Sequence, residues 1–266
     1  MNNILKFELK RSFTNYNFII IFVLLTLYGL YNIFFQIIPV SKIQFMTVEY
    51  NTPTYLWLNT LITDMFSRIF LFLTPIIAVL PFSWSYGSDY STNYVYFIYS
   101  RSKKINYIFS KFIATFLSGG VLFVYPFILQ FIILTCLYPN WPSYYGTYPI
   151  PSGSMLIDLL YTNPNTYVSV YFLLMFLYAG LFAVIGLIIG LFVSKKFVIC
   201  LVPFLLWIFS SIVLEFTGFN YLSPERFLRP TGISGSSLIF VISLWIILMS
   251  ICFGLFLKVG TKRELV

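Results

Sequence analysis

Six long runs of apolar residues alternate with polar stretches along the chain. Each run holds about 20 residues, the length that an α-helix needs to cross the hydrocarbon core of a bilayer. The pattern predicts six transmembrane helices, over residues 17–38, 64–84, 112–137, 168–193, 197–217 and 236–257. Pro39 is expected to close the first span, while Pro75 and Pro81 are expected to kink the second.

Basic residues in the polar stretches predict how the spans are oriented. Lys and Arg gather in residues 1–16, 85–111 and 194–196 and in the tail after residue 257, which together hold 12 of the 16 basic residues. Cytoplasmic segments of membrane proteins carry such an excess, so both termini are expected in the cytosol. The other four basic residues fall in outer segments or at outer span ends, and they are Lys42, Arg68, Arg226 and Arg229.

The first 16 residues predict a helix of their own. Their apolar side chains share one helical side, and these are Leu5, Leu9, Phe13 and Tyr16. The charged side chains lie off that side, so we expect an amphipathic helix along the inner membrane surface. The segment is too charged for the core of a signal peptide, and it is expected to remain uncleaved.

Three polar segments are expected on the outer side. In residues 39–63, the rings of Tyr55 and Trp57 are expected to rest at the level of the lipid headgroups. Residues 138–167 contain no Lys or Arg and are rich in Pro, Tyr, Ser, Gly and Asn, which favours a sizeable loop with a short helix near residues 155–160. Residues 218–235 form the third outer segment.

The composition supports an integral membrane protein of the all-α class. The chain is 59% hydrophobic and only 9% charged, against about 25% charged residues in ordinary soluble domains. Too few polar residues are present to cover the exterior of a soluble fold. The net charge of +8 lies beside apolar runs, so lipid headgroups, not nucleic acid, are the expected counter-charge.

The residues that most often carry catalysis are missing. The chain has no His, no Walker-type phosphate loop and no Gly-rich dinucleotide turn. Its three cysteines, Cys136, Cys200 and Cys252, each lie in an apolar run and offer neither a disulfide framework nor metal-ligand spacing. We therefore expect a chain that is not an enzyme and that holds no cofactor or metal, with any energy supplied by another polypeptide or by an ion gradient.

Residues 85–111 are the most informative polar stretch. They contain an acidic residue (Asp89), then hydroxylated residues, an apolar and aromatic run from Tyr94 to Tyr99, the pair Ser100-Arg101 and a later Lys111. This order resembles the cytosolic loop of type-2 ABC transporter permeases, which shows Glu, Gly-Thr, a Leu-rich run, Pro-x-Ser-Arg and a following Lys. Here Asp replaces Glu, Ser replaces Gly, and no Pro precedes Ser-Arg.

The resemblance implies one transmembrane permease domain over residues 1–266, in the plasma membrane of a bacterial cell. In that family the loop docks on a separate ATP-binding-cassette ATPase subunit, which binds ATP and Mg, and two permease copies enclose the transport path. Residues 218–235 would then form a re-entrant outer hairpin. The residues expected to couple to the ATPase are Asp89, Tyr94, Tyr99, Ser100, Arg101, Lys103, Lys104 and Lys111. A solvated basic turn that only touches anionic lipid is the alternative for this loop.

Three charged residues near the outer span ends are candidates for the translocation path. Asp64 and Arg68 are four residues apart, so they are expected to pair on one helix face, either at the mouth of a path or as an interfacial ion pair. Glu215 has no cation near it in sequence, and it either lines the path or snorkels to the surface. In the fourth span, small residues recur at positions 179, 183, 186 and 190, which predicts close helix packing.

The leading hypothesis is the membrane subunit of an ATP-driven exporter. The 31 Phe and 21 Tyr of the chain suit an amphipathic or lipid-like cargo, such as a hydrophobic or antimicrobial peptide. Lipid-facing surfaces nevertheless explain most of these rings. A non-transport membrane protein, such as an enzyme of lipid metabolism or a sensor, is the alternative from another class. A secondary transporter comes third. Such proteins hold ionisable or broken-helix sites near mid-membrane, whereas the clearest charges of this chain lie at the span ends.

Overall fold

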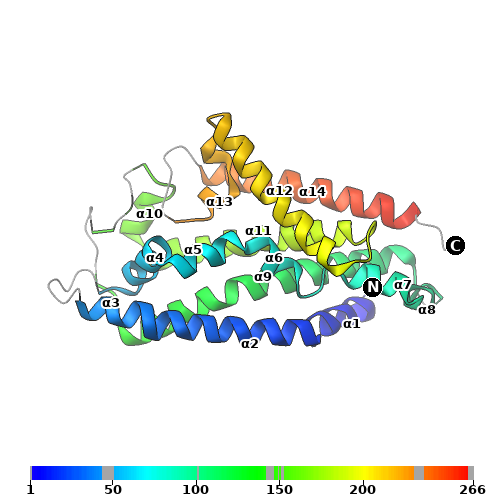
Figure 1. Cartoon of the computed structure of the whole chain (residues 1–266), viewed down its shortest axis with the longest axis horizontal. Helices are drawn as coiled ribbons and strands as arrows, with labels where there is room; N and C mark the ends of the chain where they lie inside the picture. Colours follow the sequence, from blue (N-terminus) through cyan, green and yellow to red (C-terminus); the bar gives the residue numbers. More distant parts are fainter. Residues whose placement is uncertain are drawn as a thin grey trace.

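The computed structural model describes residues 2–43, 51–100, 102–141, 147–148, 150, 153–230 and 237–262. Within these ranges every regular element is helical, and the helices form an elongated bundle (Figure 1). Five of them are long and apolar enough to cross a membrane. They are Tyr16–Ile37 (α2 with η1), α9 (Lys104–Leu137), α11 (Pro164–Ile189), α12 (Lys196–Phe216) and α14 (Leu238–Lys262). This architecture fits an all-α membrane protein.

The expected second span is interrupted instead of merely kinked. It consists of α5 (Met65–Phe72) and α6 (Thr74–Val79), followed by turns over residues 80–84. Pro75 and Pro81 each lack the backbone N–H that would continue the hydrogen-bond ladder. The described chain therefore has five continuous candidate spans and one broken segment, where the apolar pattern predicts six.

The first candidate span ends at Ile37, near the predicted end, but Pro39 does not end the helix. Helix α2 (Tyr16–Tyr31) passes into a π-helix, η1 (Asn32–Ile37), and then into α3 (Ile38–Ile43). The backbone N–H of Ile38 bonds to Ile33 O, five residues back. Pro39 thus lies within a continuous helical run, directly after the π-helix.

The segment after residue 50 is a buried helix and not a headgroup-level loop. Helix α4 (Pro53–Thr63) buries both Tyr55 and Trp57. The Trp57 ring lies edge-on to Phe131 and Phe172, with centroids 6.4 and 5.4 Å apart, so α9 and α11 cover the surface expected to meet lipid. Further along, α10 (Ile157–Thr162) confirms the short helix expected near residues 155–160.

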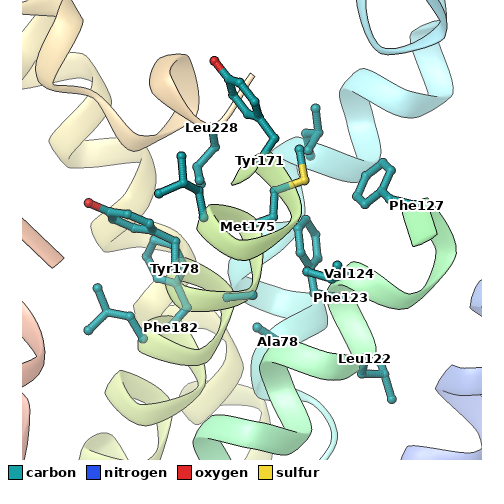
Figure 2. Packing of buried hydrophobic residues seen from close by; sticks show 14 of the residues in the cluster. Ala78, Leu122, Phe123, Val124, Phe127, Tyr171, Met175, Tyr178, Phe182 and Leu228 are labelled. Carbon is teal, nitrogen blue, oxygen red and sulfur yellow. The ribbon is translucent and has the colours of Figure 1, made fainter. Parts of the chain in front are cut away.

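Helices α6, α9 and α11 meet through small residues. A Cβ added to Gly119 of α9 would come within 2.6 Å of the Ala78 carbonyl oxygen of α6 and 2.5 Å of the Ala183 Cβ of α11. Gly186 is similarly close to Val79. The predicted packing stripe on the fourth span is confirmed, and its neighbours belong to the same chain. Figure 2 shows the apolar core beside this contact, with rings from α9 facing Met175 and Ala78.

The segment after α12 reaches deep into the bundle. It contains η3 (Asn220–Leu222) and α13 (Pro224–Phe227), and residues 231–236 lie outside the described residues. The buried Phe227 packs on Tyr178 with ring centroids 5.0 Å apart. Tyr178 is 14 residues into α11, about 21 Å from its first residue at 1.5 Å per residue. A re-entrant segment would reach such a depth.

One end of the bundle gathers basic residues, and we call it the basic end. It holds both described ends of the chain, α7, α8 and the turn between α11 and α12 (Figure 1). The Lys104 ammonium donates to Thr261 O at 2.8 Å, which joins the start of α9 to the end of α14. The described basic residues at this end are Lys6, Lys10, Arg11, Lys103, Lys104, Lys111, Lys195, Lys196 and Lys258.

Helix α1 (Asn2–Phe13) packs against α9 at the basic end (Figure 1). Its position along the inner membrane surface, expected from the amphipathic pattern, stays a prediction. The side chains that α1 buries completely are Glu8 and Ser12, while Tyr16 is 76% exposed. Leu5, Leu9 and Phe13 are partly buried, while Lys6 and Lys10 are exposed, so the inward side of α1 combines polar and apolar residues.

Candidate functional site

The predicted coupling stretch folds into two short helices at the basic end. Helix α7 (Ser85–Ser91) follows the turns at Pro81, and α8 (Tyr94–Tyr99) contains the aromatic run. Asn93 joins them with φ of 58°, a left-handed conformation that Asn tolerates better than most residues. This turn places the exposed face of α8 at the outermost part of the bundle end (Figure 1).

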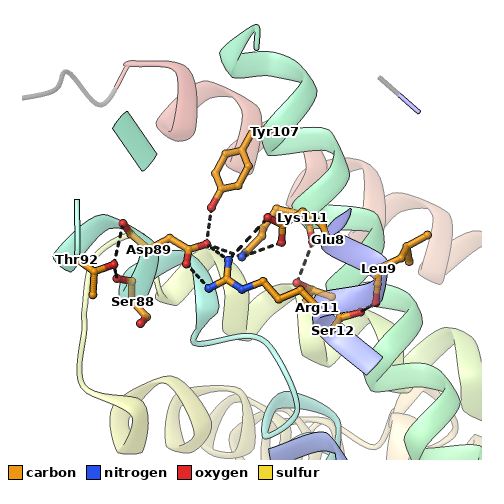
Figure 3. A network of polar contacts seen from close by, with 10 residues as sticks. Glu8, Leu9, Arg11, Ser12, Ser88, Asp89, Thr92, Tyr107 and Lys111 are labelled. Carbon is orange, nitrogen blue, oxygen red and sulfur yellow. Dashed lines mark hydrogen bonds and ion pairs between the residues drawn. The ribbon is translucent and has the colours of Figure 1, made fainter. Parts of the chain in front are cut away.

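Asp89 of α7 is the centre of a buried ionic network (Figure 3). Its Oδ2 accepts from Lys111 Nζ at 2.7 Å, from Tyr107 Oη at 2.7 Å and from Arg11 Nη1 at 2.8 Å. Arg11 Nη2 donates to Oδ1, so the guanidinium binds the carboxylate with both nitrogens. Lys111 also donates to Glu8 Oε2 at 3.1 Å. The network joins α1, α7 and α9.

The charges in this network balance. Two carboxylates, Glu8 and Asp89, face two cations, Arg11 and Lys111. Burial would raise the pKa of Asp89, but the charges of Lys111 and Arg11 outweigh it and hold that pKa below its ordinary value. The side chains of Glu8 and Lys111 are fully buried, so removing one partner would leave an uncompensated charge.

Aromatic rings enclose the two cations. Lys111 Nζ lies 4.5 Å from the centroid of Phe82 and 5.6 Å from that of Tyr107. The Arg11 guanidinium lies 5.3 Å from the ring of Tyr94, the first residue of α8. This last contact ties α8 to α1 as well, so the aromatic run is fixed to the network at its beginning.

The other predicted coupling residues lie around this core. Tyr99 packs edge-on against Tyr107, with centroids 5.9 Å apart, and burial raises its pKa. Ser100 is exposed and donates to Phe97 O, whereas Lys103 is exposed at the N-cap of α9. Lys104 Nζ also lies 5.7 Å from the Tyr99 ring. Arg101 lies outside the described residues.

The structure does not bring the outer candidates together as expected. Asp64 and Arg68 form no ion pair, because Asp64 precedes α5 as its N-cap in an extended conformation and accepts from Ser67 N at 2.7 Å. Arg68 is exposed. Glu215 does have a cation, since its Oε1 lies 3.0 Å from Arg226 Nη2, and its side chain is 66% exposed. Local capping and an exposed ion pair therefore account for these residues.

The sequence analysis missed three members of the network, which are Glu8, Arg11 and Tyr107. Each looked like an ordinary polar residue of an amphipathic helix or a basic loop. Their partners lie far away along the chain, as with Glu8 and Lys111, so no local spacing links them. Glu8 was nevertheless visible as the one acidic residue within a basic N-terminal segment.

No family model, curated protein or solved structure matches this chain. Within the described residues, no three His, Cys, Asp or Glu side chains come together as metal ligands would. The function is therefore argued from the sequence pattern and from the geometry of the basic end.

Proposed function

We propose that this chain is the membrane subunit of an ATP-driven exporter. A separate ATPase subunit, which would bind ATP and Mg, docks at the basic end over α7 and α8. A second permease copy completes the transport path. The cargo is amphipathic or lipid-like, a proposal that rests on the aromatic content of the chain alone.

The observation that carries this proposal is the combination of a fixed base and an exposed aromatic face. The ionic network ties α7 to α1 and α9, and Arg11 contacts the start of α8. On the far side of α8, Phe97 is 71% exposed and Tyr96 is 39% exposed. Exposed aromatic residues at a basic, water-facing surface favour a protein partner.

The same geometry supports a route for transmitting motion. Asp89 is bound by Lys111 of α9 and Arg11 of α1, so a displacement of α7 would carry both helices with it. Residues 80–84 connect α7 directly to the broken second span, whose α6 packs against α11 and α12. ATP binding by the partner would thus tilt the second and fifth spans and change which side a shared cavity faces.

The test is purification of the tagged chain from native membranes, followed by an ATP hydrolysis assay on the eluate. Phe97→Ser removes the exposed ring of α8, and Phe209→Ser is the matched control because Phe209 of α12 is 68% exposed at a distance from the basic end. The proposal expects ATPase activity with the wild type and the control, and at least about a fivefold loss with Phe97→Ser. An eluate from the wild type without ATPase activity would refute it.

A further inference from the structure

An open groove runs between α1, α8 and the first turn of α9. Its volume is about 740 Å³, within the range of sites that bind small ligands or side chains. Apolar side chains form its walls, with Ile4 and Phe7 on α1 and Phe97 and Ile98 on α8, while Lys103 lies at its α9 side. Phe97, the exposed ring of α8 on which the proposed docking rests, belongs to this groove, and α1 supplies a further wall that the proposed docking does not require.

The position of the groove relative to the membrane layers decides whether a lipid or a protein occupies it. Lys111 is the last charged residue before the uncharged run of residues 112–137, so we place the start of the hydrocarbon layer at Phe112. Lys103 is eight residues before Lys111 along α9, about 12 Å at 1.5 Å per residue, or about 9 Å for a helix tilted by 40°. The headgroup layer is about 5–7 Å thick. The Lys103 end of the groove therefore lies in water, where an acyl chain would be exposed.

The charge of the groove favours an acidic occupant. Its one acidic lining residue, Glu8, is already paired with Lys111. Lys103 is exposed and forms no ion pair with any described residue. Lys10 is exposed three residues beyond Phe7, on the same side of α1. The uncompensated charge at the groove is therefore positive.

We infer that the groove receives an apolar side chain from an acidic segment of the ATPase subunit. The permease then supplies the pocket, the ATPase supplies the inserted side chain, and α1 is a docking element equal to α8. Lys103 forms the ionic contact at the rim. This inference rests on the proposed function, since it names how the same partner is recognised.

Photo-crosslinking from inside and outside the groove tests where the partner sits. Benzoylphenylalanine replaces Phe7, which lines the groove, or Tyr96, which lies on α8 outside it. We expect ultraviolet light to join both positions to the copurified ATPase, and the peptide joined to position 7 to be rich in Asp and Glu. An ATPase adduct from position 96 alone would overturn the inference while leaving the proposed function standing. A lipid adduct at position 7 would also overturn it.

Matched substitutions test the two recognition elements separately. Phe7→Ser is compared with Ile105→Ser, since these side chains are 48% and 52% exposed and only Phe7 lines the groove. Lys103→Glu is compared with Lys258→Glu, which reverses an exposed charge on α14. We expect each groove variant to copurify with at least about fivefold less ATPase subunit than its control variant does. The loss caused by Lys103→Glu should be smaller at 0.5 M salt, because salt screens the charges at the rim. Equal retention in a groove variant and its control would overturn the inference.

Discussion

Replacing Lys111 with methionine should destabilise the fold more than any other single change in the ionic network. Lys111 Nζ lies 3.1 Å from Glu8 and 2.7 Å from Asp89. Without it, Asp89 keeps both Arg11 nitrogens and the Tyr107 hydroxyl. Glu8 keeps only Arg11 Nη1, at 3.8 Å. The variant therefore buries a carboxylate that has no hydrogen-bond donor.

The expected cost follows from this uncompensated charge. Breaking a buried ion pair from one side costs about 3–5 kcal/mol, or roughly a 100- to 4,000-fold change in the ratio of folded to unfolded protein. The double variant Glu8→Gln with Lys111→Met removes both charges, so it should regain about half of that loss. Arg11→Met should cost less than Lys111→Met, because Arg11 is 31% exposed and Asp89 keeps Lys111.

The assay uses thiol labelling in detergent as a measure of unfolding. Cys252 is 8% exposed, whereas Cys136 is exposed and Cys200 is partly exposed, so a background with Cys136→Ser and Cys200→Ser reports on the buried thiol. The temperature at which a maleimide dye labels Cys252 should fall in the order wild type, Arg11→Met, Lys111→Met. A Lys111→Met variant as stable as Arg11→Met, or a double variant less stable than Lys111→Met, would refute the reasoning.

Three further predictions concern acid, packing and capping. The pKa of Asp89 lies below its ordinary value, so its stabilisation is complete above about pH 4 and is lost as the pH falls through the folded pKa. Asp89→Asn should flatten that acid loss, followed by circular dichroism because thiols do not react with maleimide in acid. Gly119→Ala should destabilise the bundle by about 1–3 kcal/mol, whereas Gly254→Ala, with open space around it, should not. Asp64→Ala should cost about 1 kcal/mol through loss of the α5 cap, and Arg68→Ala should cost almost nothing. If Asp64 and Arg68 were paired, the two substitutions would cost similar amounts.

Local periodicity predicted the long helices well but not their ends. The hydrophobic runs alone placed the third, fourth and fifth spans, and the Lys195-Lys196 turn separates α11 from α12 as expected. Proline was harder to interpret, because its effect depends on the surrounding backbone. Pro39 is accommodated after a π-helix, whereas the second span is broken near Pro75 and Pro81.

The candidate site was predicted in part, from two of its three helices, α7 and α9. The acidic residue and the basic residues of 85–111 singled out Asp89 and Lys111, which do lie together. Glu8 and Arg11 could not be assigned, because only tertiary packing brings these two side chains of α1 against α9 and α7. The i, i+4 rule failed for Asp64 and Arg68 since it presumes that both residues are helical.

The central claim is that the basic end, with α7 and α8, faces the cytosol, where a separate motor can dock. Single cysteines introduced by Ser91→Cys on α7 and Trp141→Cys near the opposite end of α9 test it, in a background with the native cysteines changed to serine. Both positions are exposed. An impermeant maleimide should label the Ser91→Cys variant in inverted membrane vesicles but not in intact cells, and the Trp141→Cys variant in intact cells. Labelling of the Ser91→Cys variant in intact cells would contradict the account.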